Sequence, residues 1–297
     1  SDYIRQRPEA GVETADRTPA KSADTRTAKP KVVALSFTGS NAAVAACDPD
    51  YTEISAIQGS GDTSPLVNQQ LTTQGIVTAV VYPGSDAAGI TLQTIFADAQ
   101  HSANAAQSLF IADREAAAIY QPGQVLQVSG TVAELNQLTS LTQLSQIKLC
   151  DNTATIQPVK LSLPLAPEQH WEQLEGALLQ IEQPLVVNDT YQLGRYGEIT
   201  LADARLMVAT EIMHPGAEAA ALTAQQQLHM LVLDDGLLKQ NPDPVMFAGN
   251  TLSAANTLRV GDTLSGIEGI VLQDDRGYRI VPSRQPVYQA HNPRPDK

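Results

Sequence analysis

The chain has 297 residues, with 19 Lys and Arg against 32 Asp and Glu and a formal net charge of −13. This length suffices for about two domains, and this charge argues against a general phosphate-binding surface. Aromatic residues make up 4%, whereas 19 Gly and 18 Pro favour many short strands and exclude coiled coils and helical bundles. The uncharged stretches are short or interrupted, and none has the roughly 20 apolar residues of a membrane-spanning helix.

The N-terminal part of the chain is polar and lacks any sustained hydrophobic period. Residues 1–31 hold hardly any large apolar side chain and bury too little surface to offset their ordering entropy. We therefore expect a disordered leader and spacer over 1–46. The start at Ser1 is interpreted as a processed or cut end. Val44–Cys47 superficially matches a lipoprotein cleavage box, but the polar residues 38–41 interrupt the required apolar segment, which favours a strand and spacer.

A first block of strand-like segments follows the leader. Its segments are rich in β-branched residues and are separated by Pro-Gly turns. The predicted strands are Thr72–Tyr82, Ile90–Phe96, Leu109–Ala112, Gln124–Val132 and Leu135–Leu149. Five strands in about 100 residues are typical of a small Greek-key barrel such as the OB-fold. We predict a first OB-like domain over 47–157.

A second block resembles the first and begins after a proline-marked connector. Its predicted strands are Ala177–Ile181, Leu185–Val187, Glu198–Ala202, Met230–Asp234, Arg259–Leu272 and Tyr278–Pro282. One helix is predicted over Ala217–Leu228, which is rich in Ala, Glu and Gln. The strings Pro122–Leu126 and Val260–Leu264 each lead to a further glycine and indicate two copies of one barrel.

These signals define the expected fold class and domain order. The second OB-like domain is predicted over 158–288 and a linker over 289–297. The fold class is therefore mainly β, with two tandem OB-fold-like small barrels and one short helix, preceded by the disordered leader.

Several strings occur in a specific order along the chain. They are Ile57–Gly61, Thr73–Ala79, Tyr191–Glu198, Leu233–Gly236, Asn241–Pro244 and Asn256–Asp262. Together they resemble the OB-like N-terminal region of bacterial extracellular endonucleases of the ExeM/NucH type. In that family a metal-dependent catalytic domain of the endonuclease/exonuclease/phosphatase fold follows a junction similar to Asn292–Pro295.

The resemblance implies a secreted nuclease parent and a non-catalytic region. Mg, Mn or Ca would serve the missing catalytic domain, and no cofactor is expected in this chain. The region would position that domain, its partner in cis, on extracellular DNA, or act as a spacer. DNA contact would be weak and cation-dependent because the chain is acidic. The alternative is a scaffold or adhesion module that contacts proteins, glycans or the cell surface.

Catalytic motifs for a free-standing enzyme are missing from the sequence. There is no Gly-x-Ser-x-Gly string, no phosphate-binding loop that ends in Lys-Ser/Thr, and no pair of histidines at metal-ligand spacing. Where the family tends to have Gly-Phe-Phe-Leu-Gln, this chain has Gly89–Gln93 without a ring. The first barrel therefore lacks the aromatic platform on which OB-folds stack bases.

The two cysteines bracket the first predicted barrel. Cys47 and Cys150 lack the Cys-x-x-Cys spacing of a zinc site, and the ends of a closed barrel commonly lie close together. The secreted parentage implied by the resemblance supplies an oxidising compartment. We predict a Cys47–Cys150 disulfide.

Arg195 and Tyr196 are the candidate nucleic-acid-binding residues. Flanking glycines allow a tight turn that presents a guanidinium beside a ring. Arginine can bind a phosphate through two hydrogen bonds and tyrosine can stack on a base. The alternative is architectural: Tyr196 packs into the second barrel and Arg195 pairs with Glu198 or a nearby acid.

Two acidic turns are weaker candidates for calcium. Clustered carboxylates and carbonyls are the ligands that calcium prefers, although neither string matches an EF-hand loop. The candidate residues are Asp234, Asp235, Asp274 and Asp275. The competing interpretation is that both strings are tight turns between strands.

Overall fold

The described residues of the computed structural model are 47–95, 105–151, 154–167, 169–243, 253 and 257–292. The predicted leader over 1–46, Phe96 and the linker residues 293–297 lie outside this part of the chain. The described residues belong to one unit, Ala43–Lys297. None of the helices found in them is long and apolar enough to cross a membrane.

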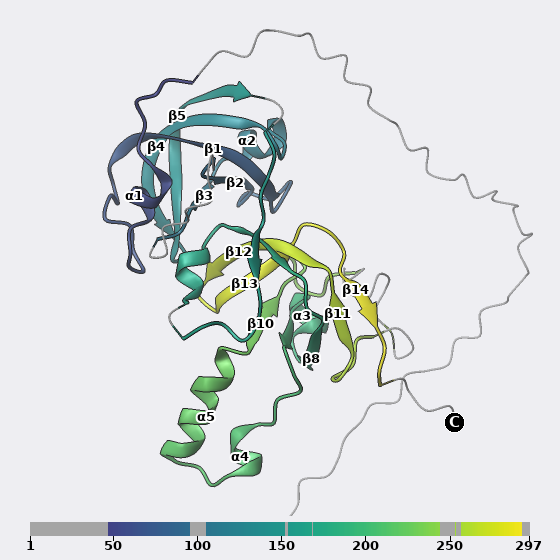
Figure 1. Cartoon of the computed structure of the whole chain (residues 1–297). Helices are drawn as coiled ribbons and strands as arrows, with labels where there is room; N and C mark the ends of the chain where they lie inside the picture. The colour runs from purple at the N-terminus through teal and green to yellow at the C-terminus, as the bar shows by residue number, and fades with distance from the viewer. Residues whose placement is uncertain are drawn as a thin grey trace, which may run out of the picture. The chain divides into compact units, whose positions relative to one another are not determined.

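The first sheet closes into a five-stranded barrel with the order β1-β2-β3-β5-β4 (Figure 1). Its strands are β1 (Gln70–Val81), β2 (Gly89–Gln93), β3 (Ser108–Ile111), β4 (Val125–Leu135) and β5 (Leu138–Asp151). Only β3 and β5 pair in parallel; the other pairs are antiparallel. Two short helices, α1 (Ile54–Gln58) and α2 (Arg114–Ile119), pack on this barrel. The predicted five-stranded, OB-like small barrel is confirmed.

The second sheet repeats this order with two broken strands. Its strands are β6 (Val159–Leu161), β7 (Leu178–Ile181), β8 (Leu185–Asp189), β9 (Ile199–Ala202), β10 (Met230–Leu233), β11 (Thr263–Ser265), β12 (Ile267–Asp274), β13 (Gly277–Pro282) and β14 (Val287–Gln289). We count β7 with β8 as the first strand, β9 and β10 as the second and third, β11 with β12 as the fourth, and β13 as the fifth. The spatial order is then again 1-2-3-5-4. The halves pair at both ends, β8 with β11 and β7 with β12, and β10 pairs in parallel with β13.

The glycine turns that suggested a repeat occupy equivalent places in the two barrels. Gly123 and Gly261 have φ angles of 93° and 94°, in the left-handed region that favours glycine. Each N–H donates to a carbonyl on the first strand of its barrel, Gly123 to Val77 and Gly261 to Val187, at 2.9 Å in both cases. The same turn therefore starts the fourth strand twice.

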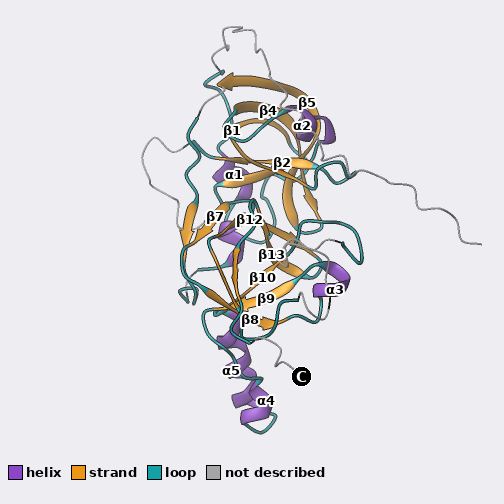
Figure 2. Ribbon diagram, turned by 90° about the vertical axis from the view of Figure 1, so that its right-hand side faces the viewer, coloured by secondary structure: helices purple, strands orange, loops and turns teal. Residues whose placement is uncertain are grey.

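The predicted helix is confirmed as α5 (Ala217–Gln227). It forms a hairpin with α4 (Ala209–Ile212), inserted between β9 and β10, and extends away from the strands (Figure 2). The sequence did not predict α1, α2, α3 (Leu193–Tyr196), α4 or the 3-10 helix η1 (Trp171–Leu174). These elements span only four to six residues, too short for a helical period to be recognised.

Each barrel has its own apolar core, and a third apolar cluster joins the two. The buried residues of this third cluster are Val81, Phe110 and Leu138 from the first barrel and Leu178, Ile270 and Leu272 from the second. The two barrels thus pack against each other through this third cluster, with β12 of the second barrel against the outer face of the first.

The structure contains the predicted disulfide between Cys47 and Cys150. Their Cα atoms lie 5.3 Å apart across a sequence separation of 103 residues. Cys150 lies near the end of β5, and Cys47 precedes α1. The bond therefore ties the segment before the first barrel to its last strand.

We predict that replacing both cysteines, Cys47→Ser with Cys150→Ser, lowers the free energy of unfolding by about 2–5 kcal/mol. The reason is that the unfolded chain regains the freedom of a loop of 103 residues. Urea unfolding of the oxidised protein and the variant measures this difference, with a thiol assay as the control for oxidation. Equal midpoints and slopes would contradict the prediction.

Candidate nucleic-acid interface

Arg195 and Tyr196 end the short helix α3 in the loop between β8 and β9. The helix stops at Gly197, whose φ angle is 72°, and a Cβ atom there would lie only 2.1 Å from a carboxylate oxygen of Asp235. The Arg195 carbonyl accepts a hydrogen bond of 2.7 Å from the Asn241 N–H. Both contacts hold the loop against the segment that follows β10.

Two guanidinium groups lie beside the Tyr196 ring. The Cζ atoms of Arg195 and Arg276 are each 5.2 Å from the ring centroid, a distance at which a cation is attracted to a ring. Arg276 comes from the turn between β12 and β13. The site therefore joins the loop between the first and second strands to that between the fourth and fifth, which are the loops that bind oligonucleotides in OB-folds.

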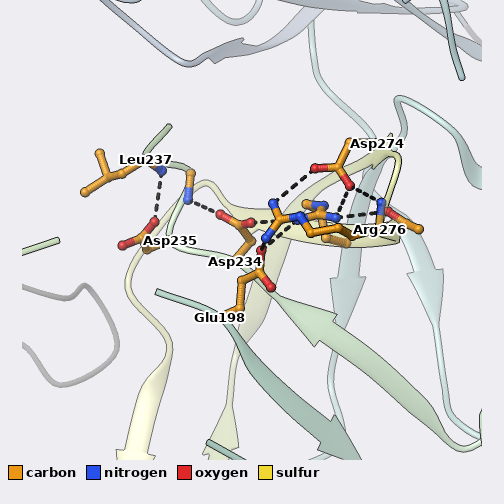
Figure 3. Close-up of polar contacts among 9 residues, drawn as sticks. Glu198, Asp234, Asp235, Leu237, Asp274 and Arg276 are labelled. Atoms are coloured by element: carbon orange, nitrogen blue, oxygen red, sulfur yellow. Dashed lines mark hydrogen bonds and ion pairs between the residues drawn. The ribbon is translucent and has the colours of Figure 1, made fainter. Parts of the chain in front are cut away.

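Arg279 anchors the acidic residues beneath this site. Its side chain is buried, with 4% of the residue exposed. The Nη1 atom donates to Glu198 at 2.8 Å and to Asp234 at 3.2 Å, and Nη2 donates to Asp274. Arg276 donates to Glu198 and, at 3.1 Å, to Asp274 (Figure 3). Glu198, Asp234 and Asp274 thus form one ionic network with the two arginines.

The four calcium candidates do not share one site. Asp234 and Asp274 pair with arginine, Asp235 accepts from the Leu237 N–H at 2.9 Å, and Asp275 is exposed in the turn. No group of three or more His, Cys, Asp or Glu residues within the described ranges has the geometry to hold a metal ion. The arginines therefore neutralise two of the four carboxylates that the sequence suggests as cation ligands, Asp234 and Asp274.

Asp235 is a buried acidic residue of this region and, unlike Asp234 and Asp274, has no ion pair among the described residues. Its Oδ2 atom is buried and has no hydrogen-bond partner there. Burial raises the pKa of Asp235 to about 6, against the opposing effect of the Leu237 N–H. Its position against Gly197 makes it part of the wall behind α3 rather than a free cation ligand.

A groove of about 520 Å³ continues from Arg276 across the outer face of β9 and β10. Thr200 and Val232 point to this face because the residues beside them along each strand are buried in the core. Trp171 and Tyr278 add aromatic walls. The groove thus lies between this strand face, α5 and the segment around Trp171, and it meets the Tyr196 site at Arg276.

The corresponding face of the first barrel is covered. Every residue of β2 and β3 is buried, and Phe110 packs in the shared cluster against Leu178 and Leu272 of the second barrel. A Cβ atom at Gly89 would lie 2.5 Å from the Phe110 ring. Two phenylalanine rings in place of Ile90 and Thr91 would therefore find no open surface there on which a base could stack.

Tyr82 shows that the first barrel reaches the ionic network. It lies in the loop between β1 and β2, the counterpart of the loop that carries Tyr196. Burial, together with the nearby charge of Asp234, raises the pKa of Tyr82 to about 12. The loop that would carry a ligand in the first barrel is thus occupied by contact with the second.

The structure brings Arg195 and Tyr196 together as predicted and adds a residue that sequence reasoning missed. Arg276 lies 80 positions from Tyr196 and belongs to a string interpreted as a turn. In the described part of the chain Arg195 makes no ion pair with Glu198, which binds Arg276 and Arg279 instead. A repeat alignment of the loops between strands one and two and strands four and five could have placed Arg276 near Tyr196.

We predict that Arg279→Met lowers the free energy of unfolding by about 3–5 kcal/mol, because it leaves the buried carboxylate of Asp234 without its cation and Glu198 with only the more exposed Arg276. The matched control is Arg284→Met, which removes a more exposed pair with Glu268 and should change stability by about 1 kcal/mol or less. Urea unfolding of both variants measures the difference. Similar losses in the two would show that the network does not stabilise the fold.

Comparisons with known proteins identify one family signal. Residues 145–292 match the model of a domain of unknown function, DUF8508, a range that covers the end of β5 and all strands of the second sheet. No curated protein matches the chain. A solved structure of a murine DNA-binding protein bound to double-stranded DNA matches with a TM-score of 0.27 and 8% identity, over 73% of this chain and 97% of that one. A TM-score of this size does not carry a fold or a function to this chain.

Proposed function

We propose that this chain is an accessory region that binds nucleic acid through its second barrel. The observation that carries the proposal is the Tyr196 ring, held between the two loops with Arg195 and Arg276 each 5.2 Å from its centroid. The groove that begins at Arg276 and crosses β9 and β10 offers room for further units of a strand. The face of the first barrel serves for packing, so the second barrel carries the site.

Each side chain has a distinct part in this proposal. The exposed Arg195 binds a phosphate, and Tyr196 stacks on a base. Arg276, tied to Glu198 and Asp274, fixes the position of the ring rather than acting as a free phosphate ligand. Trp171 in the groove provides a second ring for a neighbouring base. Rings can stack only on bases that are not paired within a duplex, and the site has few free cations for the phosphates. These features favour binding of single strands over duplex.

The larger assignment is that the region belongs to a secreted metal-dependent nuclease and positions its catalytic domain on extracellular DNA. It is supported by the ordered strings that resemble the ExeM/NucH-type enzymes and by a disulfide that fits an oxidising compartment. With a net charge of −13, binding should be weak and should gain from divalent cations that screen the carboxylates.

We predict that Tyr196→Ala weakens binding of a fluorescent single-stranded oligonucleotide by about 5- to 150-fold, the range expected for one lost base stack. Arg195→Ala should weaken binding and reduce the slope of log affinity against log salt concentration by about 1, the value for one lost phosphate contact. Fluorescence anisotropy in a salt series, with and without calcium, measures both. Arg114→Ala, in an exposed pair on the first barrel, is the matched control.

The outcomes separate the candidate functions. Unchanged affinity in both site variants, with folding intact, would place DNA contact elsewhere. No binding of any strand by the unaltered chain would favour the scaffold alternative. A specific feature supports that alternative: Met207, Val208 and Ile212, next to and within α4, are 50%, 60% and 54% exposed and could pack against a protein.

We also predict that the isolated chain does not cut DNA with magnesium, manganese or calcium. The sequence holds no recognised constellation that activates water and neutralises a phosphoryl transition state. Incubation of supercoiled plasmid with purified chain, followed by gel electrophoresis, tests this prediction. Cleavage that persists after repeated purification and stops with a chelator would reveal a site that the motifs missed.

A further inference from the structure

Glu175 lies in the segment between η1 and β7, at the junction of the two barrels. Only 1% of the residue is exposed. Its Oε1 atom accepts hydrogen bonds from two groups of the first barrel, the Thr139 N–H at 3.0 Å and the Gln58 side-chain amide at 3.3 Å. A carboxyl group from the second barrel is therefore held inside a pocket of the first.

Three buried polar atoms at this junction have no hydrogen-bond partner among the described residues. They are Oε2 of Glu175, Oε1 of Gln58 and Oγ of Ser108. The Gln58 amide nitrogen donates to the Ser108 carbonyl as well as to Glu175, which links all three residues. An ionised carboxylate with a bare buried oxygen is strongly disfavoured. A carboxylic acid could instead donate its proton to one of the two open acceptors.

The ionisable groups that face Glu175 make its negative charge still less favourable. Acidic neighbours come from both barrels: Glu134 at the end of β4 accepts from the Thr139 hydroxyl at 3.0 Å, and Glu172 in η1 accepts from the Tyr278 hydroxyl. Asp62 lines a crevice with Gln58, Glu172 and His170. Glu134, Glu172 and Glu175 have no basic ion-pair partner among the described residues.

We propose that Glu175 is a proton-dependent latch between the barrels. When its carboxyl is protonated, Oε2–H donates to Gln58 Oε1 or Ser108 Oγ and completes the polar contacts of the junction. When it is ionised, Oε2 can no longer donate, Gln58 Oε1 is left buried without a donor, and the charges of Glu134 and Glu172 repel the carboxylate, so the junction loosens. This inference does not depend on nucleic-acid binding.

The pKa of Glu175 agrees with this geometry. Burial, and then the charge of Glu172, raise the pKa to about 8 from an ordinary value of 4.5. A carboxyl whose pKa is higher in the folded protein binds a proton there that the unfolded chain has already lost. The stabilisation is therefore complete below about pH 4.5 and disappears as the pH rises to about 8.

The test is amide hydrogen exchange of the whole chain across this pH range, corrected for the chemical exchange rate. We expect the opening equilibrium of peptides that contain Thr139 and Ser108 to rise by up to about tenfold per pH unit between pH 5 and 8. Peptides from β9 and β10, away from the junction, should show a much smaller change. A pH-independent opening of the junction would overturn the proposal.

Two variants sharpen the test. Glu175→Gln keeps the shape and supplies a permanent donor, so it should abolish the pH dependence and keep the junction closed at pH 8. The control Glu182→Gln removes an exposed carboxylate from the same barrel and should behave like the unaltered chain. If Glu175→Gln retains the original profile, the proposal is wrong. If added calcium, compared with a chelator, closes the junction of the unaltered chain at pH 8, the acids bind a cation and the proton latch is also wrong.

Discussion

The packing of Phe110 against Leu178 and Leu272 decides how the two barrels are used. Because this contact buries the outer face of β2 and β3, the first barrel cannot offer that face to a ligand. The same face in the second barrel, formed by β9 and β10, borders a groove. The same fold therefore occurs twice in different roles. The outer face of the first barrel packs against the second, and the second barrel carries the candidate site.

Two arginines set the electrostatics of the site. The network beneath Tyr196 contains three carboxylates and two guanidinium groups, a formal charge of −1 that the nearby Arg195 offsets. Asp235 and Asp275 lie in the same region without an ion pair among the described residues, so the neighbourhood of the ring remains acidic, as does the chain with its net charge of −13. Divalent cations that screen these carboxylates would ease the approach of an anionic strand, which agrees with the proposed weak, cation-assisted contact.

Residue patterns within single segments predicted most of the strands, but they did not predict features that depend on contacts between distant segments. Tyr278–Pro282 was predicted and β13 spans Gly277–Pro282, since β-branched runs and turn residues act over a few positions. The predicted strand Arg259–Leu272 instead breaks into β11 and β12 around Gly266, which has a φ angle of 65°. Its bend is set by closure of the barrel, which a single segment does not encode.

The candidate site shows the same division between local and distant information. Arg195 and Tyr196 were found because they are adjacent in the sequence, whereas Arg276 joins them only through the meeting of two loops. The sequence also places Glu172 and Glu175 close together as possible paired carboxylates, but it does not distinguish them from surface residues, because only the first barrel encloses Glu175. Burial of an acid at a junction is a tertiary property. Chemistry that depends on two barrels meeting therefore becomes visible only once the shared cluster around Phe110 is known.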